Sequence, residues 1–543
     1  MDAHTILSRD RSVIASRAQC VRAVCLFVVA AAVTISGCTP LGEYVRNGFQ
    51  VGPNYRKPAA PVEVQWIDFQ KDFRIKEDSV DIGSWWRVFN DAKLDQLVRT
   101  ASQQNISLRA AGAQILQAKA ALGIAVGNIF PQTQQAVGGY SRNQLSKNTA
   151  NPPPVSYFNQ LATGFNLSWE LDFWGLYRRG IESADASLDA SVENYDNVLV
   201  ILVSNVASTY VQIRTLQEEI RLTKENVRIQ KEALKIAEAQ WRAGQSDQAD
   251  FLQTRDNVEQ TEALIPPLEA SLRQANDALC ILLGMPPQDL MPWLGEGPQF
   301  PIPTAPPDVA VGIPAELLRR RPDVRQAERI AAAQCAQIGV AEAQLYPHIA
   351  IDGVLGWQGT RLSNLFTPHS FAGSVGPAFT WNVLNYGRLL NGVRQQEAIF
   401  EQTVFNYQSS VLSAQQETED SIVGFLKAQE QTAKLRRAVN DVNQLNSLLM
   451  VQAQAGARNW NRVFVVQQQA TTQENNLATS VGNIALNLIQ LYRALGGGWE
   501  IRLQPVDDNR DASAPNAVLV PDAPRLEGPP APQPALPEKT TGT

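Results

Sequence analysis

Histidine and cysteine are scarce in this chain, which contains 3 His and 5 Cys among 543 residues. They do not show the short, repeated spacing of metal ligands, so we expect no structural metal site. Beyond the first 40 positions the only cysteines are Cys280 and Cys335. Because small disulfide-stabilised proteins are short and dense in cysteine, we expect two buried thiols here and no disulfide framework.

The chain also lacks an excess of basic charge. Lys and Arg number 47 against 53 Asp and Glu, which gives a formal net charge of −6. No stretch is basic enough to indicate phosphate binding, so we expect no nucleic-acid partner. The sequence shows no nucleophile paired with a base, no glycine loop for a phosphate and no acid pair in a pocket pattern. We therefore expect no enzyme activity and no cofactor other than attached lipid.

Long apolar runs are missing as well. After the N-terminal leader, no stretch has 18 consecutive apolar residues, so the sequence offers no transmembrane helix. Only helices and closed β-barrels satisfy their backbone polar groups in lipid. Any membrane crossing would therefore use β-strands.

The N-terminus has the features of a secretory signal. Arginines between positions 9 and 22 form a positive segment, and the apolar run Ala23–Ile35 is too short for a comfortable membrane span. Gly37-Cys38 resembles the bacterial lipobox, which predicts cleavage after residue 37 and a diacylglycerol and an N-acyl chain on Cys38. Thr39 in place of Asp resembles lipoproteins that are sorted to the outer membrane. The alternative is an ordinary signal that ends near a cysteine.

The second half of the chain repeats the first. A shift of 212 residues, without a gap, aligns Trp169 with Trp381, Gly175 with Gly387, Ala243-Gly244 with Ala455-Gly456, and Leu283-Gly284 with Leu495-Gly496. Upstream the shift is 216, which aligns Pro131 with Pro347. Solenoid repeats are only roughly 20–50 residues long. The longer period indicates a duplicated half-domain.

Two segments alternate between apolar and small or polar residues with the period of a β-strand, 161–173 and 371–383. At roughly 3.3 Å per residue each strand would be about 43 Å long, which is enough for a tilted strand to cross a bilayer. Partner strands are expected at about 134–144 and 349–359. Four strands cannot close a barrel, since about eight is the smallest number in membrane barrels. The chain must therefore oligomerise or form no barrel.

A proline-free stretch dominated by helix-forming residues begins at Gly175. Every seventh residue from Val192 to Trp241 is apolar, which predicts left-handed packing of helices along one seam. A helix over 175–242 would extend about 100 Å.

Each long helix is followed by a turn and a returning helix. The turns are Ala243-Gly244 and, in the second copy, Ala455-Gly456. Asp247 or Asp250 would begin the first returning helix. Pro266-Pro267 predicts a kink or a break in it, because proline removes a helical hydrogen bond and clashes with the preceding turn.

Several motifs together resemble one protein family. They are Val51-Gly52-Pro53-Asn54-Tyr55, Trp85-Trp86 with Phe89-Asn90-Asp91 and Leu94, Asn105-Ile106-Ser107-Leu108, Arg320-Arg321-Pro322-Asp323-Val324 with Ala327-Glu328, and the paired Ala-Gly turns. In this order, over about residues 52–499, the chain resembles the outer-membrane factor family of TolC-like channels. Within that family it is most similar to the lipoprotein branch of OprM- and NodT-type proteins.

The resemblance implies an α+β membrane protein that assembles as a homotrimer. Each protomer would give four strands to one twelve-stranded outer-membrane β-barrel, which continues into a long periplasmic α-helical barrel. The implied function is the passive outer-membrane channel of a tripartite efflux system. Its partners would be a periplasmic adaptor, an inner-membrane pump of the RND type and outer-membrane lipid. Alternatives are a duct for type I protein secretion and a lipid-anchored periplasmic coiled-coil scaffold without a pore.

The implied order of segments follows the duplication. It is a signal peptide 1–37; a lipid-anchored extended segment 38–90; periplasmic helices 91–133; strands 134–173; a helical hairpin 174–284; an equatorial linker 285–313; periplasmic helices 314–347; strands 348–384; a second hairpin 385–496; and a Pro-rich disordered tail 497–543.

The resemblance also implies functional residues at the two hairpin turns. Adaptors dock at the tips of related proteins, which points to Ala243, Gly244, Ala455 and Gly456. Each glycine would end a helix whether or not an adaptor docks there.

A periplasmic gate is the second implied site. Related channels carry an acidic residue six positions after the tip glycine and an aromatic residue three positions before it. Asp250 and Trp241 fit this pattern, whereas the second copy has Arg462 and Ala453. Three Asp250 facing three Arg462 would form ion pairs that favour a closed state. The alternative is that both are solvated charges near helix starts.

Acidic residues on the polar strand face would line the channel. Glu170 and Asp172, with Asp352 if it points the same way, would slightly favour cations. The other residues of this face are mostly small or uncharged, so they do not identify a cargo.

Overall fold

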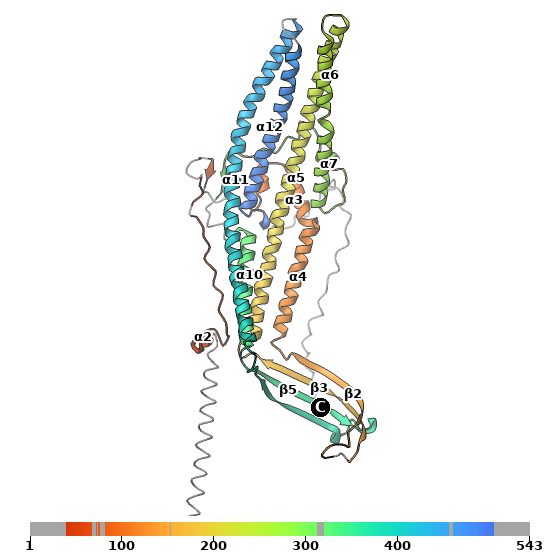
Figure 1. The fold of residues 1–543 in the computed structure, drawn as a ribbon, viewed down its shortest axis with the longest axis vertical. Coiled ribbons are helices and arrows are strands. Elements are labelled where there is room, and N and C mark those ends of the chain that lie inside the picture. Colours follow the sequence, from red (N-terminus) through yellow and green to blue (C-terminus); the bar gives the residue numbers. More distant parts are fainter. Residues whose placement is uncertain are drawn as a thin grey trace, which may run out of the picture.

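The computed structural model describes residues 40–503, except residues 64, 68–71, 73, 77–81, 152–153, 312–319 and 456–459. A sheet lies at one end of an elongated body, and two long helical hairpins point away from it (Figure 1). The expected signal peptide, Cys38, Gly456 and the chain beyond residue 503 lie outside the described residues.

Four antiparallel strands form the sheet. In spatial order they are β2 (Thr133–Gln144), β3 (Tyr157–Leu171), β5 (His348–Gly359) and β6 (Phe371–Thr380). β3 begins four residues before the expected position 161, and β6 ends three residues before 383. Beyond β6 the chain leaves the ladder, and Trp381 donates its indole N–H to Leu345 O at 3.0 Å. Trp169, its equivalent in the first copy, donates to Ile129 O at 2.9 Å.

Two helices of 67 residues each carry the duplication, α5 (Leu176–Arg242) and α11 (Arg388–Gln454). The helices that return from their tips are α6 (Gln248–Glu262), α7 (Ile265–Leu282) and α12 (Trp460–Ala494). The heptad seam predicted for α5 is confirmed in its middle part by the buried residues Leu199, Val206, Ile213, Ile220 and Val227.

The first returning helix is interrupted and the second is continuous. α6 and α7 are separate helices, and Pro266-Pro267 lies in the first turn of α7. Proline is tolerated there because the first N–H groups of a helix have no helical partner. The equivalent Ala478-Thr479 lies inside α12. The predicted interruption is confirmed, although α7 restarts at Ile265 and not at Leu268.

Shorter elements complete the fold. They are α2 (Leu41–Arg46), β1 (Ile75–Lys76), η1 (Trp85–Phe89), α3 (Ala92–Gln104), α4 (Ile106–Gly127), α8 (Met291–Leu294), β4 (Val309–Ala310), α10 (Pro322–Ala343), η2 (Leu362–Asn364), η3 (Pro368–Ser370) and η4 (Trp499–Leu503). The largest buried cluster lies where η1 and α3 pack against α5, α7 and α12. Within it, Trp85 stacks on Tyr492 with ring centroids 5.4 Å apart.

In each half of the duplication, a polar side chain donates a hydrogen bond to a carbonyl at the end of the returning helix. Asn105 donates from Nδ2 to Leu282 O, at the end of α7, over 2.9 Å. Arg321, which lies 216 residues later, donates from Nη1 to Ala494 O, at the end of α12, over 2.8 Å. Carbonyls in the last turn of a helix have no partner within the helix. Both copies therefore satisfy the same carbonyl with a residue at the same position.

A left-handed glycine follows each of these carbonyls. Gly284 and Gly496 both have φ of +74°. A Cβ on Gly284 would collide with Gln104 O, and a Cβ on Gly496 would lie 3.0 Å from Arg321 Cα. Glycine is therefore required for conformation and for space at both positions.

Residues 497–503 correct the expectation of a tail that begins at 497. A Cβ on Gly497 would lie 2.8 Å from Ile82 O, so this segment packs tightly on the N-terminal part of the core. Arg502 Nε lies 2.5 Å from Oδ1 of Asp196, whose side chain is 1% exposed. The segment is therefore a folded part of the body.

One described helix, α5, contains an 18-residue window with a mean hydropathy of 1.3, long and apolar enough to cross a membrane. Of this window, 67% is buried inside the protein. Its apolar character is accounted for by packing in the core.

Gly284→Ala should lower the free energy of unfolding by about 1–3 kcal/mol, because alanine would be held at positive φ with its Cβ against Gln104 O. Gly180→Ala is the matched control. Gly180 lies inside α5 with open space around it, so alanine should raise the stability by about 0.5–1 kcal/mol. Thermal unfolding followed by circular dichroism measures both changes in stability. An unchanged midpoint for Gly284→Ala would contradict the requirement for glycine at position 284.

Candidate functional site

The turn between α5 and α6 is a Schellman motif. Gly244 has φ of +71°, and its N–H donates to Trp241 O at 2.9 Å. Gln245 N–H donates to Gln240 O, also at 2.9 Å. Ala243 and Gly244 are exposed, at the end of the molecule opposite the sheet (Figure 1). The apex of this tip therefore presents backbone and a methyl group.

Trp241 packs within its own hairpin. Its ring stacks on that of Phe251 in α6, with centroids 4.9 Å apart and the ring planes at 6°. The Arg255 guanidinium lies over the Phe251 ring, 5.7 Å from its centroid. The residue predicted as part of a gate therefore joins α5 to α6 beside the turn.

The second tip is packed differently. Ala453, which replaces the aromatic residue of the first copy, is 2% exposed and belongs to a buried cluster with Val463 and Phe464 of α12. The second tip thus has a buried phenylalanine from its returning helix but no counterpart of Trp241 on α11. Ala455 is exposed and caps α11, and its neighbour Gly456 lies outside the described residues.

The two charged residues predicted to gate the mouth do not meet within one protomer. Asp250 is half-buried in the first turn of α6, and Arg462 is exposed in the first turn of α12. Asp247, and not Asp250, caps α6 by accepting the Ala249 N–H at 3.4 Å. Within the described part of the chain, neither Asp250 nor Arg462 forms an ion pair. The predicted ion pair between them is therefore not present within the described protomer.

The sheet presents one apolar face and one face of small or polar residues. The register places Ser168 opposite Asp352 and Glu170 opposite Ala350 on the polar face. Ser168 Oγ donates to Asp352 Oδ1 at 2.6 Å. On this face of the four described strands, Glu170 and Asp352 are the only Asp, Glu, Lys or Arg residues. Both acidic side chains thus lie on the predicted face.

Asp172 does not join them. It lies just after β3, and its carboxylate accepts the backbone N–H groups of Tyr177 and Arg178, each at 3.0 Å. It also accepts from Arg178 Nε at 2.9 Å. Because the N-cap residue of α5, Gly175, has no side chain, Asp172 satisfies the first N–H groups of that helix. The expectation that Asp172 lines the polar face is wrong.

Sequence reasoning missed a polar contact between the sheet and α5. Glu170 Oε2 accepts from the Tyr177 hydroxyl at 3.0 Å, and its Oε1 lies 2.5 Å from His348 Nδ1. Burial, followed by the hydrogen bond to Glu170, raises the pKa of Tyr177, so the phenol remains a donor. A shift of 212 residues takes Glu170 to Asn382 and Tyr177 to Leu389. The repeat therefore gave no signal for this contact.

Comparison with known proteins identifies the family. Residues 97–285 and 313–497 match the family model described as outer membrane efflux protein. The chain belongs to this family. It is 30% identical over 470 residues to Nodulation protein T of Rhizobium leguminosarum bv. trifolii, which covers 85% of this chain and 97% of the relative. The two matched ranges coincide with the two halves of the duplication.

Other relatives agree with this assignment. The pyoverdine export outer membrane protein OpmQ of Pseudomonas putida is 31% identical over 438 residues, which cover 77% of this chain and 88% of OpmQ. The solved outer-membrane channel OprN has a TM-score of 0.77 at 28% identity, covering 83% of this chain and 99% of OprN. The family resemblance read from the sequence is therefore confirmed: the structural neighbours are outer-membrane channels and not enzymes.

Trp241→Ala should loosen the first hairpin tip, because it removes the stack on Phe251, which is worth about 0.5–1.5 kcal/mol beyond the area buried. Hydrogen exchange of amides in 236–255 should become about 2- to 10-fold faster, as this free energy implies. Ile67→Ala is the control, since Ile67 is 69% exposed and its backbone N–H donates to Glu419 in the middle of α11, away from the tip. Unchanged exchange in 236–255 would refute this role for Trp241.

Proposed function

We propose that this protein is the outer-membrane channel of a tripartite efflux system and that three copies build the channel. The observation that carries the proposal is the open sheet, because among the described strands β2 and β6 each pair on one side only. In lipid, an unpaired backbone group costs several kcal/mol. Three sheets joined edge to edge would make a closed barrel of twelve strands without such groups.

The apolar face of the sheet supports contact with lipid. The register places Trp169 and Phe379 near the helices, and Trp357 and Phe371 near the opposite loops. Phe366, from the loop between β5 and β6, packs against Trp357 with ring centroids 5.9 Å apart. Barrels of the outer membrane carry aromatic girdles at both interfaces around an apolar band. The two groups of rings fit that arrangement.

Exposed apolar residues on the helices support assembly with other copies. In α4, only Leu108 and Ala111 are buried. Large exposed apolar side chains on α4 and α11 are Ile106, Leu116, Ile124, Val126, Leu390, Phe405, Leu412, Val423, Leu445, Leu448 and Val451. Extended apolar surfaces of this kind mark interfaces. Packing of these helices between neighbouring copies would form a tunnel on the scale of the long helices, about 100 Å.

The N-terminal segment supports lipid attachment at Cys38. The described chain begins two residues later, and Tyr44 OH donates to Phe173 O at 2.8 Å. Arg178 Nη1 donates to Gly48 O at 2.7 Å. These contacts hold the segment at the junction of sheet and helices, where the inner surface of the outer membrane would lie. A diacylglycerol and an N-acyl chain on Cys38 would then reach lipid directly.

Cys38→Ser should abolish incorporation of an alkyne-labelled fatty acid into the protein. Cys280→Ser is the control, because the Cys280 thiol is buried and would not be acylated. Gel detection of the label after copper-catalysed coupling distinguishes them. Undiminished labelling of Cys38→Ser would exclude lipidation at this residue.

The hairpin tips would face the partners. The exposed backbone at Ala243, Gly244 and Ala455 would dock a periplasmic adaptor, which joins the channel to an inner-membrane pump of the RND type. Conduction through the channel itself would be passive, with small molecules as cargo. The name of OpmQ, a relative that exports pyoverdine, supports an export channel here.

Asp250 and Arg462 of neighbouring copies would pair in the closed channel. Each pair at such a partly exposed site contributes about 0–1 kcal/mol, so three pairs would favour closure by at most roughly 3 kcal/mol. In planar lipid bilayers we expect discrete conductance steps from the wild type. Combining Asp250→Ala with Arg462→Ala should raise the conductance, because the closed state loses its ion pairs.

The control combines Lys224→Ala with Glu269→Ala, which removes an exposed 2.8 Å ion pair between α5 and α7 below the tip. It should leave the conductance unchanged. Absence of any conductance from the wild type and the Asp250/Arg462 variant would refute the channel. A conducting wild type with an unaltered Asp250/Arg462 variant would refute only the gate.

A further inference from the structure

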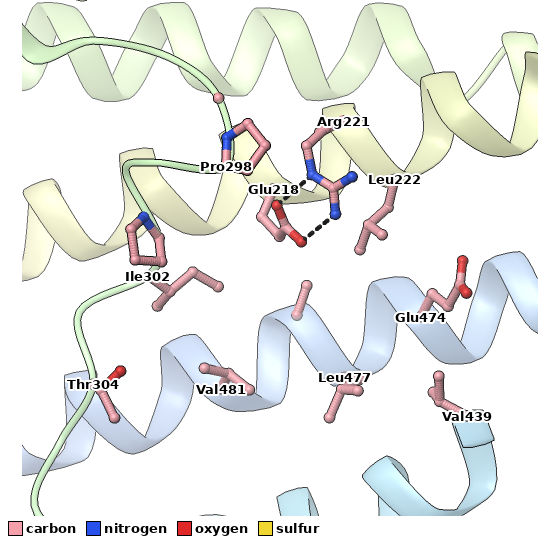
Figure 2. A pocket seen from close by; sticks show the side chains of 13 residues that line it. Glu218, Arg221, Leu222, Pro298, Ile302, Thr304, Val439, Glu474, Leu477 and Val481 are labelled. Atoms are coloured by element: carbon pink, nitrogen blue, oxygen red, sulfur yellow. Dashed lines mark hydrogen bonds and ion pairs between the residues drawn. The ribbon is translucent and has the colours of Figure 1, made fainter.

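An apolar groove of about 450 Å³ connects the two hairpins (Figure 2). Leu222 of α5 lies on one side, and Leu477 and Val481 of α12 lie on the other. The loop after α8 contributes Pro298 and Ile302. The groove thus combines side chains from both halves of the duplication and from the linker between them.

The charged groups at the rim already have partners. Glu218 and Arg221 form an ion pair at 2.7 Å, which Figure 2 shows at the edge of the groove. Glu474 accepts from Asn226 and Asn443, each at 2.9 Å. An apolar segment could therefore enter the groove without leaving a rim charge unpaired, which is the main penalty for burying apolar groups beside ions.

The chain contains such a segment within reach. Beyond Leu503, the sequence has one run of four apolar residues, Ala517–Val520, and Pro residues occur on both sides of it. Arg502 anchors the last described segment to Asp196 of α5. The groove lies 22 to 26 residues further along α5, which is about 33–39 Å at the helical rise. The 14 residues from 503 to 517 span about 43 Å when extended as in Pro-rich chains.

We propose that Ala517–Val520 of the same chain docks in this groove. Val518, Leu519 and Val520 supply the apolar side chains that match Leu222, Leu477 and other apolar residues of the lining. Because the segment is tethered, its effective concentration at the groove is in the millimolar range, so even weak intrinsic binding is populated.

Docking would make the C-terminal segment a clamp across the two hairpins. The segment would contact α5 on one side and α12 on the other. This inference does not depend on the channel activity proposed above, because the contact is within one chain.

The test is site-specific photocrosslinking in the full-length protein. Leu519 is replaced by p-benzoylphenylalanine, and crosslinked peptides are identified by mass spectrometry after irradiation. Crosslinks are expected to residues 218–222, 298–304 or 474–481. The same probe at Leu536, in the same tail but outside the apolar run, should give a yield at least about fivefold lower, since less apolar surface would be buried there.

Two variants locate the contact. With the probe at Leu519, Leu477→Ser should reduce the yield at least about fivefold, because a hydroxyl replaces apolar surface in the groove. Leu252→Ser changes a leucine that is 41% exposed on α6 outside the groove, and it should leave the yield unchanged.

Three outcomes would overturn the proposal. They are crosslinks from position 519 that fall elsewhere or nowhere, equal yields from 519 and 536, and crosslinks between chains in a mixture of isotopically light and heavy protein. The crosslink map of the chain without groove substitutions decides the matter even if Leu477→Ser fails to fold.

Discussion

Unpaired backbone groups at the edges of the four-stranded sheet are the constraint on which the proposed assembly depends. Within the described strands, β2 and β6 each have one unpaired edge. One of the two faces of the sheet is apolar and aromatic. Such a sheet can enter lipid only if its edges are paired. Joining three copies would satisfy the edges, and it would also cover the exposed apolar sides of α4 and α11. One requirement of backbone chemistry thus links the sheet, the helices and the number of copies.

The duplicated halves share their framework and differ at their ends. The framework includes the carbonyl closure by Asn105 and Arg321 and the left-handed Gly284 and Gly496. The ends have diverged: only the first copy has the Glu170 contact with α5, and the Trp241 ring of the first tip is replaced by the buried Ala453 in the second. Shared positions therefore maintain the hairpins, whereas the diverged positions lie where the protein would meet membrane and partners.

Periodic features were predictable from the sequence, and contacts between distant segments were not. The alternation in 161–173 and the heptad from Val192 located strands and helices to within a few residues, because each pattern reports which face of an element is buried. Asp172 was placed wrongly because its role depends on the path of the chain after β3, which brings the N–H groups of Tyr177 and Arg178 to its carboxylate. The folding of 497–503 was missed because its stability comes from Asp196 and Trp85, far away in the sequence.

The mass of the assembly tests the central claim most directly. The full-length protein carrying Cys38→Ser, which removes the attachment site for lipid, is extracted in mild detergent and weighed by native mass spectrometry. The account predicts a complex of three protomers that still requires detergent and dissociates only on heating. A monomer that stays dispersed in water without detergent would contradict it.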